Sequence, residues 1–283
     1  MTSYPGQRPT ISCEFFPPKT DKGMANLGVA QRKLDEAMQP AFYSVTFGAG
    51  GSTRDRTLET VDHLRSADDI RVAPHISCIG SSRQQLRELL ARYIERGIDR
   101  LVTLRGDIPA EGASGNDFHH ANELVEFIRE ETGNHFHIEV AAYPEYHPES
   151  ESPQSDFDNF VRKINAGADS AITQYFYNID AYSRFIDKCE SAGLNIAVVP
   201  GIMPITNFAQ LARFSDACGA EIPRWIRKQL EAYGDDLDSL RAFGADVVTD
   251  LCARLLHIGA PGLHFYTLNQ ADATLEIWRK LNS

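Results

Sequence analysis

The chain has 283 residues, 42% of them hydrophobic, and its 28 basic and 39 acidic residues give a formal net charge of −11. This size allows one large domain, and the negative charge argues against nucleic acid or an anionic membrane as a partner. Five widely spaced cysteines without a CxxC pair are typical of reduced core thiols in a cytoplasmic protein. Residues 1–10 are polar and contain two prolines, which favours a flexible tail over a signal peptide or a membrane span.

The first apolar run, residues 11–16, predicts a short buried strand that ends at a proline pair. Alternation places Ser12, Glu14 and Phe16 on one face of this strand, with Glu14 near its C-terminal end. Burial disfavours a charged carboxylate, so we expect a raised pKa for Glu14, which suits a proton donor near neutral pH. The alternative is a carboxylate that caps a loop or pairs with an arginine.

Further strands and helices alternate along the chain. A helix-like stretch, a glycine, a polar residue and an apolar run recur around Gly97, Gly167 and Gly193; glycine suits the left-handed position after a helix. Strands are predicted at residues 11–16, 42–46, 71–76, 100–104, 136–141, 170–174, 195–199 and 262–266. Helices are predicted at residues 24–37, 53–66, 82–95, 119–131, 156–166 and 180–192, with longer helical material from 206 to 256.

Eight β/α units in a chain of 283 residues favour an α/β fold of the (β/α)8 TIM-barrel type over an open doubly wound sheet. No linker divides the sequence, so we expect residues 1–283 to form a single catalytic domain. In a TIM barrel, active sites lie at the C-terminal ends of the strands. The residues that follow the predicted strands are therefore the candidate site.

Polar and aromatic side chains follow these strands. They include Thr46, His75, Arg105, Asp107, Tyr143, Glu145, His147, Gln174, Tyr266 and Asn269. Hydrogen-bonding groups mixed with flat rings suit a planar heteroaromatic ligand better than a sugar or a simple acid.

Two familiar kinds of site fit the sequence poorly. The stretch Gly48-Ala49-Gly50-Gly51-Ser52-Thr53 resembles a dinucleotide-binding turn, but a threonine stands at the third glycine position, so we do not expect a Rossmann site. His75 and His147, with Glu14 and Asp107, could imitate a metal centre, yet the sequence has no HxH, HExxH or compact ligand pair. We expect no metal.

Several other polar residues have structural explanations. Glu139 and His264 fall within strands, and we favour partnered core residues over catalytic ones. The acidic run at 235–238 suits a helix N-terminus, and His119-His120 suits a loop or helix start.

One motif per strand carries a resemblance that runs in order from about residue 11 to 270. The motifs are Glu14-Phe15-Phe16-Pro17-Pro18-Lys19, Ser44-Val45-Thr46-Phe47-Gly48-Ala49, Pro74-His75-Ile76-Ser77-Cys78, Leu104-Arg105-Gly106-Asp107, Ala141-Ala142-Tyr143-Pro144-Glu145, Ala171-Ile172-Thr173-Gln174-Tyr175-Phe176, Pro200-Gly201-Ile202-Met203-Pro204 and His264-Phe265-Tyr266-Thr267-Leu268-Asn269. Together they resemble the catalytic domain of bacterial-type methylenetetrahydrofolate reductases. The resemblance implies a TIM barrel that holds FAD and reduces 5,10-methylenetetrahydrofolate to 5-methyltetrahydrofolate with NADH or NADPH, by ping-pong kinetics.

The resemblance also implies roles for individual residues. Glu14 matches the general acid that opens the five-membered folate ring, and Asp107 matches a catalytic aspartate near flavin and pterin. Glu14, Gln174, Gln210 and Phe214 match substrate-binding positions. The FAD-binding positions fall on Thr46, His75, Arg105, Gly106, Asp107, Ala141, Tyr143, His147, Asp156, Asn159 and Lys163. Of the two cations, Lys163 is the better candidate for a mere surface ion pair, and Arg105 the weaker one.

Two positions depart from the family pattern. His120 stands where many relatives have tyrosine before an alanine, and Gln270 stands where bacterial relatives often have arginine. Two other functions stay open: a same-fold folate reductase that is flavin-free or fed by a partner protein, and a non-catalytic flavin- or folate-binding subunit. The fold and family favour a homo-oligomer.

Overall fold

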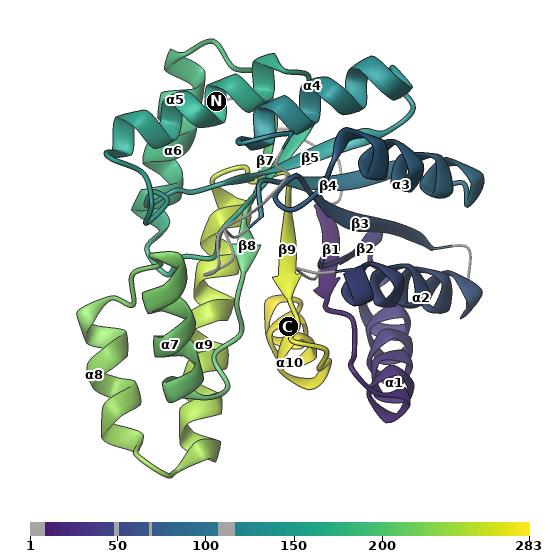
Figure 1. Cartoon of the computed structure of the whole chain (residues 1–283). Helices are drawn as coiled ribbons and strands as arrows, with labels where there is room; N and C mark the ends of the chain where they lie inside the picture. The colour runs from purple at the N-terminus through teal and green to yellow at the C-terminus, as the bar shows by residue number, and fades with distance from the viewer. Residues whose placement is uncertain (1–8, 48–50, 68–69, 107–116) are drawn as a thin grey trace.

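The computed structural model describes residues 9–47, 51–67, 70–106 and 117–283 (Figure 1). Within this part of the chain, nine parallel strands form one sheet in the order β7-β6-β5-β4-β3-β2-β1-β9-β8. The strands are β1 Thr10–Phe15, β2 Phe42–Val45, β3 Arg71–Ser77, β4 Arg100–Leu104, β5 His137–Ala142, β6 Ser170–Thr173, β7 Ala197–Val199, β8 Gly201–Ile202 and β9 Gly262–Tyr266. The predicted strand positions are confirmed within about two residues, except that the seventh strand is split.

The split of the seventh strand closes the sheet into a barrel. β7 pairs with β6, whereas β8 pairs with β9, and only Pro200 separates the two segments. Proline has no N–H to donate to a strand ladder, but its carbonyl accepts a hydrogen bond from the backbone N–H of His264 at 3.0 Å. The first and last strands of the order are therefore halves of one extended segment. The predicted TIM barrel is confirmed, and the open doubly wound sheet is wrong.

The close approach at this seam requires a glycine. The backbone N–H of Gly201 donates to Oγ1 of Thr173 at 2.9 Å, and the hydroxyl of Tyr266 donates to the carbonyl of Thr173 at 2.8 Å. A Cβ at residue 201 would meet that carbonyl oxygen and would lie 2.6 Å from the ring of Tyr266. The absence of a side chain thus lets β6, β8 and β9 meet.

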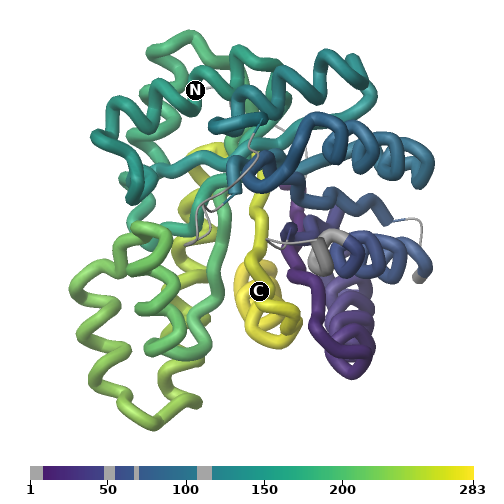
Figure 2. The backbone as a smooth tube through the Cα atoms, viewed as in Figure 1, coloured from purple at the N-terminus to yellow at the C-terminus, as the bar shows by residue number. Residues whose placement is uncertain are grey.

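Helices surround the strands on the outside of the barrel (Figure 1). They are α1 Asp21–Met38, α2 Gly51–Ala67, α3 Arg83–Glu95, α4 Ala121–Thr132, α5 Pro153–Asn165, α6 Ile179–Ser191, α7 Phe208–Cys218, α8 Arg224–Tyr233, α9 Leu237–His257 and α10 Asp272–Leu281. The first six predicted helices are confirmed with shifted ends. In Figure 2 the last helix, α10, lies between α9 and α1, and the indole of Trp278 donates to the carbonyl of Ala37 at 2.9 Å.

Three details of the predicted elements were wrong or missing. The helical material at 206–256 divides into α7, α8 and α9, because Gly219 ends α7 with φ 75°, Pro223 precedes α8, and Gly234 ends α8 with φ 54°. Helix α10 was not predicted. Thr10, assigned to the tail, is the first residue of β1; residues 1–8 lie outside the described part of the chain.

The smaller structural predictions are confirmed. Asp236 caps α9 by accepting the backbone N–H of Ser239 at 3.1 Å, and His120 is the residue before α4. Glu139 is buried and accepts a hydrogen bond from Nη1 of Arg100 at 2.8 Å, as a partnered core residue should. All five cysteines are free, and Cys218 alone is partly exposed. No helix of the described residues is long and apolar enough to cross a membrane.

Candidate active site at the C-terminal end of the barrel

Four neighbouring strands bring their inward-facing side chains to Glu14. Parallel pairing sets Glu14 of β1 beside Ser44 of β2 and Tyr266 of β9, and His75 comes from β3. The side chain of Glu14 is 18% exposed and therefore largely buried. The predicted position of Glu14 near the end of a buried strand is confirmed.

The carboxylate of Glu14 is surrounded by a serine and two imidazoles. Its Oε2 lies 3.1 Å from Nε2 of His75 and 3.7 Å from Nε2 of His264, and accepts a hydrogen bond from Oγ of Ser44 at 3.3 Å. We call Glu14, Ser44, His75 and His264 the Glu14 cluster. On its other side the His264 ring is hydrogen-bonded through Nδ1 to Oγ of Ser12 at 2.7 Å, which fixes the orientation of the ring.

The pKa of Glu14 contradicts the expectation from sequence. Burial acts to raise this pKa, but the charge of His75 and hydrogen bonds from His264 and His75 outweigh it and lower the pKa to about 2. A carboxylate beside imidazole partners is stabilised in its charged form. In the ligand-free site Glu14 is therefore an anion, and the predicted raised pKa is wrong for this state.

This ionisation predicts an acid-dependent loss of stability. A carboxyl whose pKa is lower in the folded state stabilises the fold above its unfolded pKa of about 4.5, and that contribution disappears as the pH falls toward about 2. We expect the free energy of unfolding of the wild type, minus that of Glu14→Gln, to shrink steadily between pH 5 and about 3 in urea titrations. Glu130→Gln on the exposed face of α4 is the control and should change little. A difference independent of pH would contradict the ionised state.

Of the two cations predicted to bind FAD, Arg105 and not Lys163 forms a surface ion pair. Arg105 forms an ion pair with Glu149 at 2.6 Å and donates from Nε to the carbonyl of Gly106 at 3.2 Å. The half-buried Lys163 has no carboxylate within 4 Å among the described residues, and its Nζ donates to the carbonyl of Ala141 at 2.5 Å. Burial lowers the pKa of Lys163 to about 8, while Asp156 acts in the opposite direction. The ion-pair alternative thus applies to Arg105 rather than Lys163.

The remaining predicted FAD positions lie at the ends of β2 to β5 and on α5. Thr46 directly follows β2, and Gly106 follows β4 with φ 87°. The rings of Tyr143 and His147 meet edge to face at 4.7 Å in the segment after β5. Burial and the charge of Arg105 lower the pKa of His147, whose Nδ1 accepts the backbone N–H of Glu149 at 3.1 Å.

On α5, Asp156 accepts a hydrogen bond from Oγ of Ser150 at 3.1 Å. Asn159 is exposed, and its side-chain Oδ1 accepts a hydrogen bond from Nη1 of Arg162 at 2.9 Å. Both residues lie in the first two turns of the helix, whose N-terminal cap is Ser152. Asp107 and the glycines at 48 and 50 lie outside the described residues.

Apart from Glu14, the predicted substrate residues lie after β6 and on α7. Gln174 directly follows β6, next to the Thr173 carbonyl that Tyr266 binds. Gln210 and Phe214 lie one turn apart on α7, and this helix is joined to the segment after β6 by a 3.0 Å hydrogen bond between Tyr175 and Ser215. The structure thus connects all three to the strand ends, while their contacts with a ligand stay a prediction.

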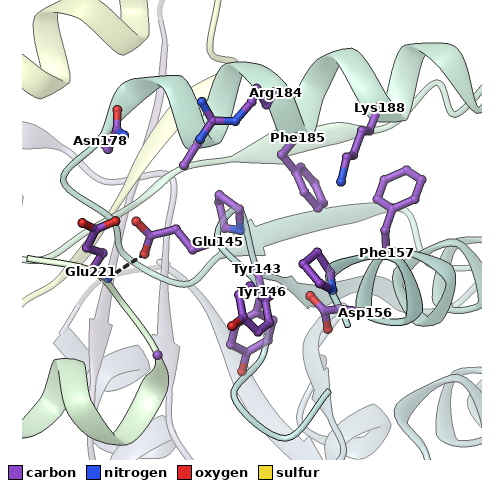
Figure 3. Close-up of a pocket in the computed structure, with 14 residues that line it drawn as sticks. Tyr143, Glu145, Tyr146, Asp156, Phe157, Asn178, Arg184, Phe185, Lys188 and Glu221 are labelled. Atoms are coloured by element: carbon purple, nitrogen blue, oxygen red, sulfur yellow. Dashed lines mark hydrogen bonds between the residues drawn. The ribbon is translucent and has the colours of Figure 1, made fainter. Parts of the chain in front are cut away.

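A cavity of about 380 Å³ lies beside the predicted flavin residues (Figure 3). Tyr143 and Asp156 line it, together with Phe157 of α5 and Phe185 of α6. Glu145, seen in Figure 3 facing Glu221, accepts the backbone N–H of that residue at 2.8 Å. No residue of the Glu14 cluster lines this cavity, so it is separate from the place where Glu14 would act.

Ser44 and His264 were not expected beside Glu14. The complete burial of His264 and its bond to Ser12 confirm the predicted partnered core residue, but the same ring also lies 3.7 Å from Glu14. Alternation along β2 and β9 places both side chains on the inward face, and this signal could have found them. Among the described residues, no three His, Cys, Asp or Glu side chains form a group that could hold a metal ion.

The sequence matches the family model described as methylenetetrahydrofolate reductase over residues 3–282. The chain belongs to this family. It is 39% identical over 274 residues to the 5,10-methylenetetrahydrofolate reductase of Pectobacterium carotovorum, covering 97% of this chain and 90% of that protein. The corresponding Escherichia coli protein is 38% identical over 271 residues, with 96% and 90% covered.

Other reductases of the family extend beyond the matched region. The Arabidopsis thaliana protein named methylenetetrahydrofolate reductase (NADH) 1 is 35% identical over 288 residues, which cover 96% of this chain but 48% of that protein. Among solved structures, an uncharacterized Clostridium thermocellum protein described as binding two copies of 5-methyl-5,6,7,8-tetrahydrofolic acid shares the fold. It has a TM-score of 0.68 at 15% identity, with 98% of this chain and 97% of that chain covered.

Proposed function

We propose that this member of the reductase family reduces 5,10-methylenetetrahydrofolate to 5-methyltetrahydrofolate, with bound FAD and with NADH or NADPH as electron donor. The relatives that match nearly the whole chain carry this activity in their names. The observation that supports it best is the Glu14 cluster, an acid placed among imidazoles at the end of the barrel where this fold carries its active sites. The proposed partner is a small reduced folate.

The described residues fit FAD. Lys163 is a half-buried cation with no carboxylate within 4 Å among the described residues. An anionic pyrophosphate would stabilise this group. Lys163 and Arg105 would hold the phosphates or ribose, and His75, Thr46 and Gly106 would lie toward the ring. When bound, FAD supplies the two electrons that pass from nicotinamide to folate.

Lys163 makes this fit testable without an activity assay. Lys163→Met should weaken FAD binding about 10- to 100-fold, because it removes a cation from beside an anionic ligand. The wild type should also bind FAD less tightly as the pH rises through about 8, where Lys163 loses its charge, and the variant should lose that dependence. Titration of apoprotein with FAD, followed by flavin fluorescence, measures both. Lys228→Met, which removes an exposed cation of α8, should bind FAD as the wild type does; unchanged affinity in Lys163→Met would exclude this contact.

The chemistry proposed for Glu14 is protonation of the folate. Opening the five-membered ring between N5 and N10 creates a 5-iminium cation that accepts hydride, and protonation drives that opening. The anionic Glu14 of the ligand-free site must first gain a proton. A pterin ring that covers the exposed 18% of its side chain would strengthen the burial effect, which raises the pKa of Glu14, and so favour the protonated carboxyl.

Other site residues have supporting roles in this proposal. Gln174, Gln210 and Phe214 would contact the folate, and Asp107 would favour cationic character in the ring. Nicotinamide and folate would use the same mouth of the barrel in turn, which gives ping-pong kinetics. Ser44 and the Ser12–His264 pair would keep Glu14 and its imidazole partner in fixed orientations.

The test is an anaerobic absorbance experiment on protein loaded with FAD. Bleaching of the flavin band by NADH or NADPH, followed by its recovery on addition of 5,10-methylenetetrahydrofolate, is the expected result and identifies the donor. Failure to take up FAD would refute the flavin mechanism. A flavin that neither nucleotide bleaches would refute the donor and point to a partner protein, and bleaching without recovery would refute folate as the acceptor.

A further inference from the structure

A turn after the last strand is joined to the backbone of Glu14 and of Phe16. Beyond β9, Oγ1 of Thr267 donates to the carbonyl of Glu14 at 2.6 Å. Two residues later, the carboxamide of Asn269 makes two bonds to Phe16: Oδ1 accepts its backbone N–H at 2.9 Å, and Nδ2 donates to its carbonyl at 2.8 Å. We call these three hydrogen bonds the Asn269 clamp.

The clamp takes the place of backbone pairing between β1 and β9, which cannot extend into the two prolines after Phe16. The regular pairing of β1 with β9 ends at Glu14 and Tyr266, and Pro17 and Pro18 follow Phe16 without N–H groups. The carboxamide of Asn269 therefore acts as a substitute strand for a single residue, one donor and one acceptor facing the two backbone groups of Phe16. The clamp holds the chain after Glu14 on the β9 side, whereas on the β2 side the carbonyl of Phe15 accepts the backbone N–H of Thr46 at 3.0 Å.

The clamp is built on an unfavourable backbone conformation. Leu268 and Asn269 have φ values of 51° and 59°, two of the four positive φ angles among the described residues other than glycine. Asparagine tolerates this left-handed region, but leucine does so rarely. Strained conformations that persist at the rim of a site are often part of its function. Elsewhere in the chain, the exposed Gln39 adopts φ 48° as an ordinary helix C-cap.

The side chain presented by the clamp lies at the mouth of the barrel. Phe16 directly follows β1, and it is 45% exposed, which is unusual for a large aromatic ring. Continued alternation of the chain places it on the face of Glu14, and its exposure, against 18% for Glu14, puts the ring farther out than the acid. Their spacing depends on the backbone that the clamp holds.

We propose that Asn269 is a positioning residue, which fixes Glu14 at its proton-donating position and Phe16 as an aromatic contact for the ring system of the folate. This inference rests on the proposed function, because it assigns the clamp to the folate step alone. Reduction of the flavin by NAD(P)H needs no proton from Glu14. The clamp should therefore affect the two half-reactions unequally, which a purely structural role would not do.

The decisive variant is Asn269→Gly, which removes the carboxamide and also relieves the positive φ angle. We expect the oxidation of reduced flavin by 5,10-methylenetetrahydrofolate to slow about 10- to 100-fold, since small displacements of a reacting group cost this much, while flavin reduction stays within about twofold. Gln39→Gly is the matched control, because it relieves a similar backbone conformation far from the site, and both half-reactions should be unchanged. Asn269→Asp keeps the acceptor for the N–H of Phe16 and loses the donor, so its effect should be intermediate.

Two further measurements separate the clamp from the proposed function. Hydrogen exchange of the segment 14–18 reports only the amides of residues 14–16, because both prolines lack an amide hydrogen. In Asn269→Gly these amides should exchange at least 10-fold faster than in the wild type. Phe16→Ala should raise the KM for folate with little change in kcat. Unchanged exchange in Asn269→Gly would refute the clamp whatever the activity. If Asn269→Gly slows both half-reactions equally, the clamp has only a structural role. If the wild type itself does not reduce folate, the proposed function is refuted instead.

Discussion

Replacement of Glu14 by glutamine is expected to slow folate reduction severely while leaving flavin reduction by NAD(P)H nearly intact. Glutamine keeps the size of the side chain and can still accept from Ser44, but it cannot carry a proton to the folate. A positioned general acid contributes roughly 10²- to 10⁴-fold, so the folate half-reaction should slow by about that factor. Anaerobic stopped-flow absorbance measures the two half-reactions separately.

The comparison with Glu130→Gln controls for the loss of one negative charge, since Glu130 is exposed on α4. This control should match the wild type in both half-reactions. If Glu14→Gln loses both half-reactions equally, Glu14 holds the site together and is not the acid. If it retains folate reduction, the proton comes from another group.

Replacement of Gly201 by alanine is expected to destabilise the protein by about 3 kcal/mol or more. The new Cβ would meet the carbonyl of Thr173 and lie 2.6 Å from the ring of Tyr266, and neither the β6 backbone nor this ring, hydrogen-bonded to β6, can move freely. The clash lies at the seam where β8 closes the barrel. Urea denaturation at pH 7 measures the loss.

Gly193→Ala is the matched control for the seam. Gly193 has φ 71°, but a Cβ there would have no atom within 4 Å, so it should cost only the backbone strain of about 1 kcal/mol. Similar losses for the two variants would mean that backbone conformation, not closeness of the strands, decides the effect at Gly201.

The positions of the strands and the location of Glu14 near the end of the first one were predictable because both depend on local patterns. Apolar runs and glycines such as Gly97 gave the strands, and the position of Glu14 at the end of the first one gave the site. The division of the seventh strand was not predictable from such patterns, since it depends on which neighbours β7 and β8 find.

The charge state of Glu14 could not be predicted for a related reason. Its imidazole partners come from β3 and β9, and His264 lies near the opposite end of the sequence. Burial alone, which alternation does predict, would raise the pKa, whereas the partners reverse the sign. The same holds for Lys163, because only the fold shows that Glu149 pairs with Arg105 and leaves Lys163 without a carboxylate within 4 Å among the described residues.

The pairing of β1 with β9 has a consequence for the order in which the protein is made. Glu14 emerges from the ribosome long before its partners on the β9 side, His264 and Thr267. The hydrogen bond between Thr267 and Glu14 joins residues that are 253 apart in sequence. Contacts between such distant residues form late, because a long loop must close first. A nascent chain can pair β1 through β6 in succession, but the Glu14 cluster is complete only when β9 has been synthesised, so a truncated translation product would lack it.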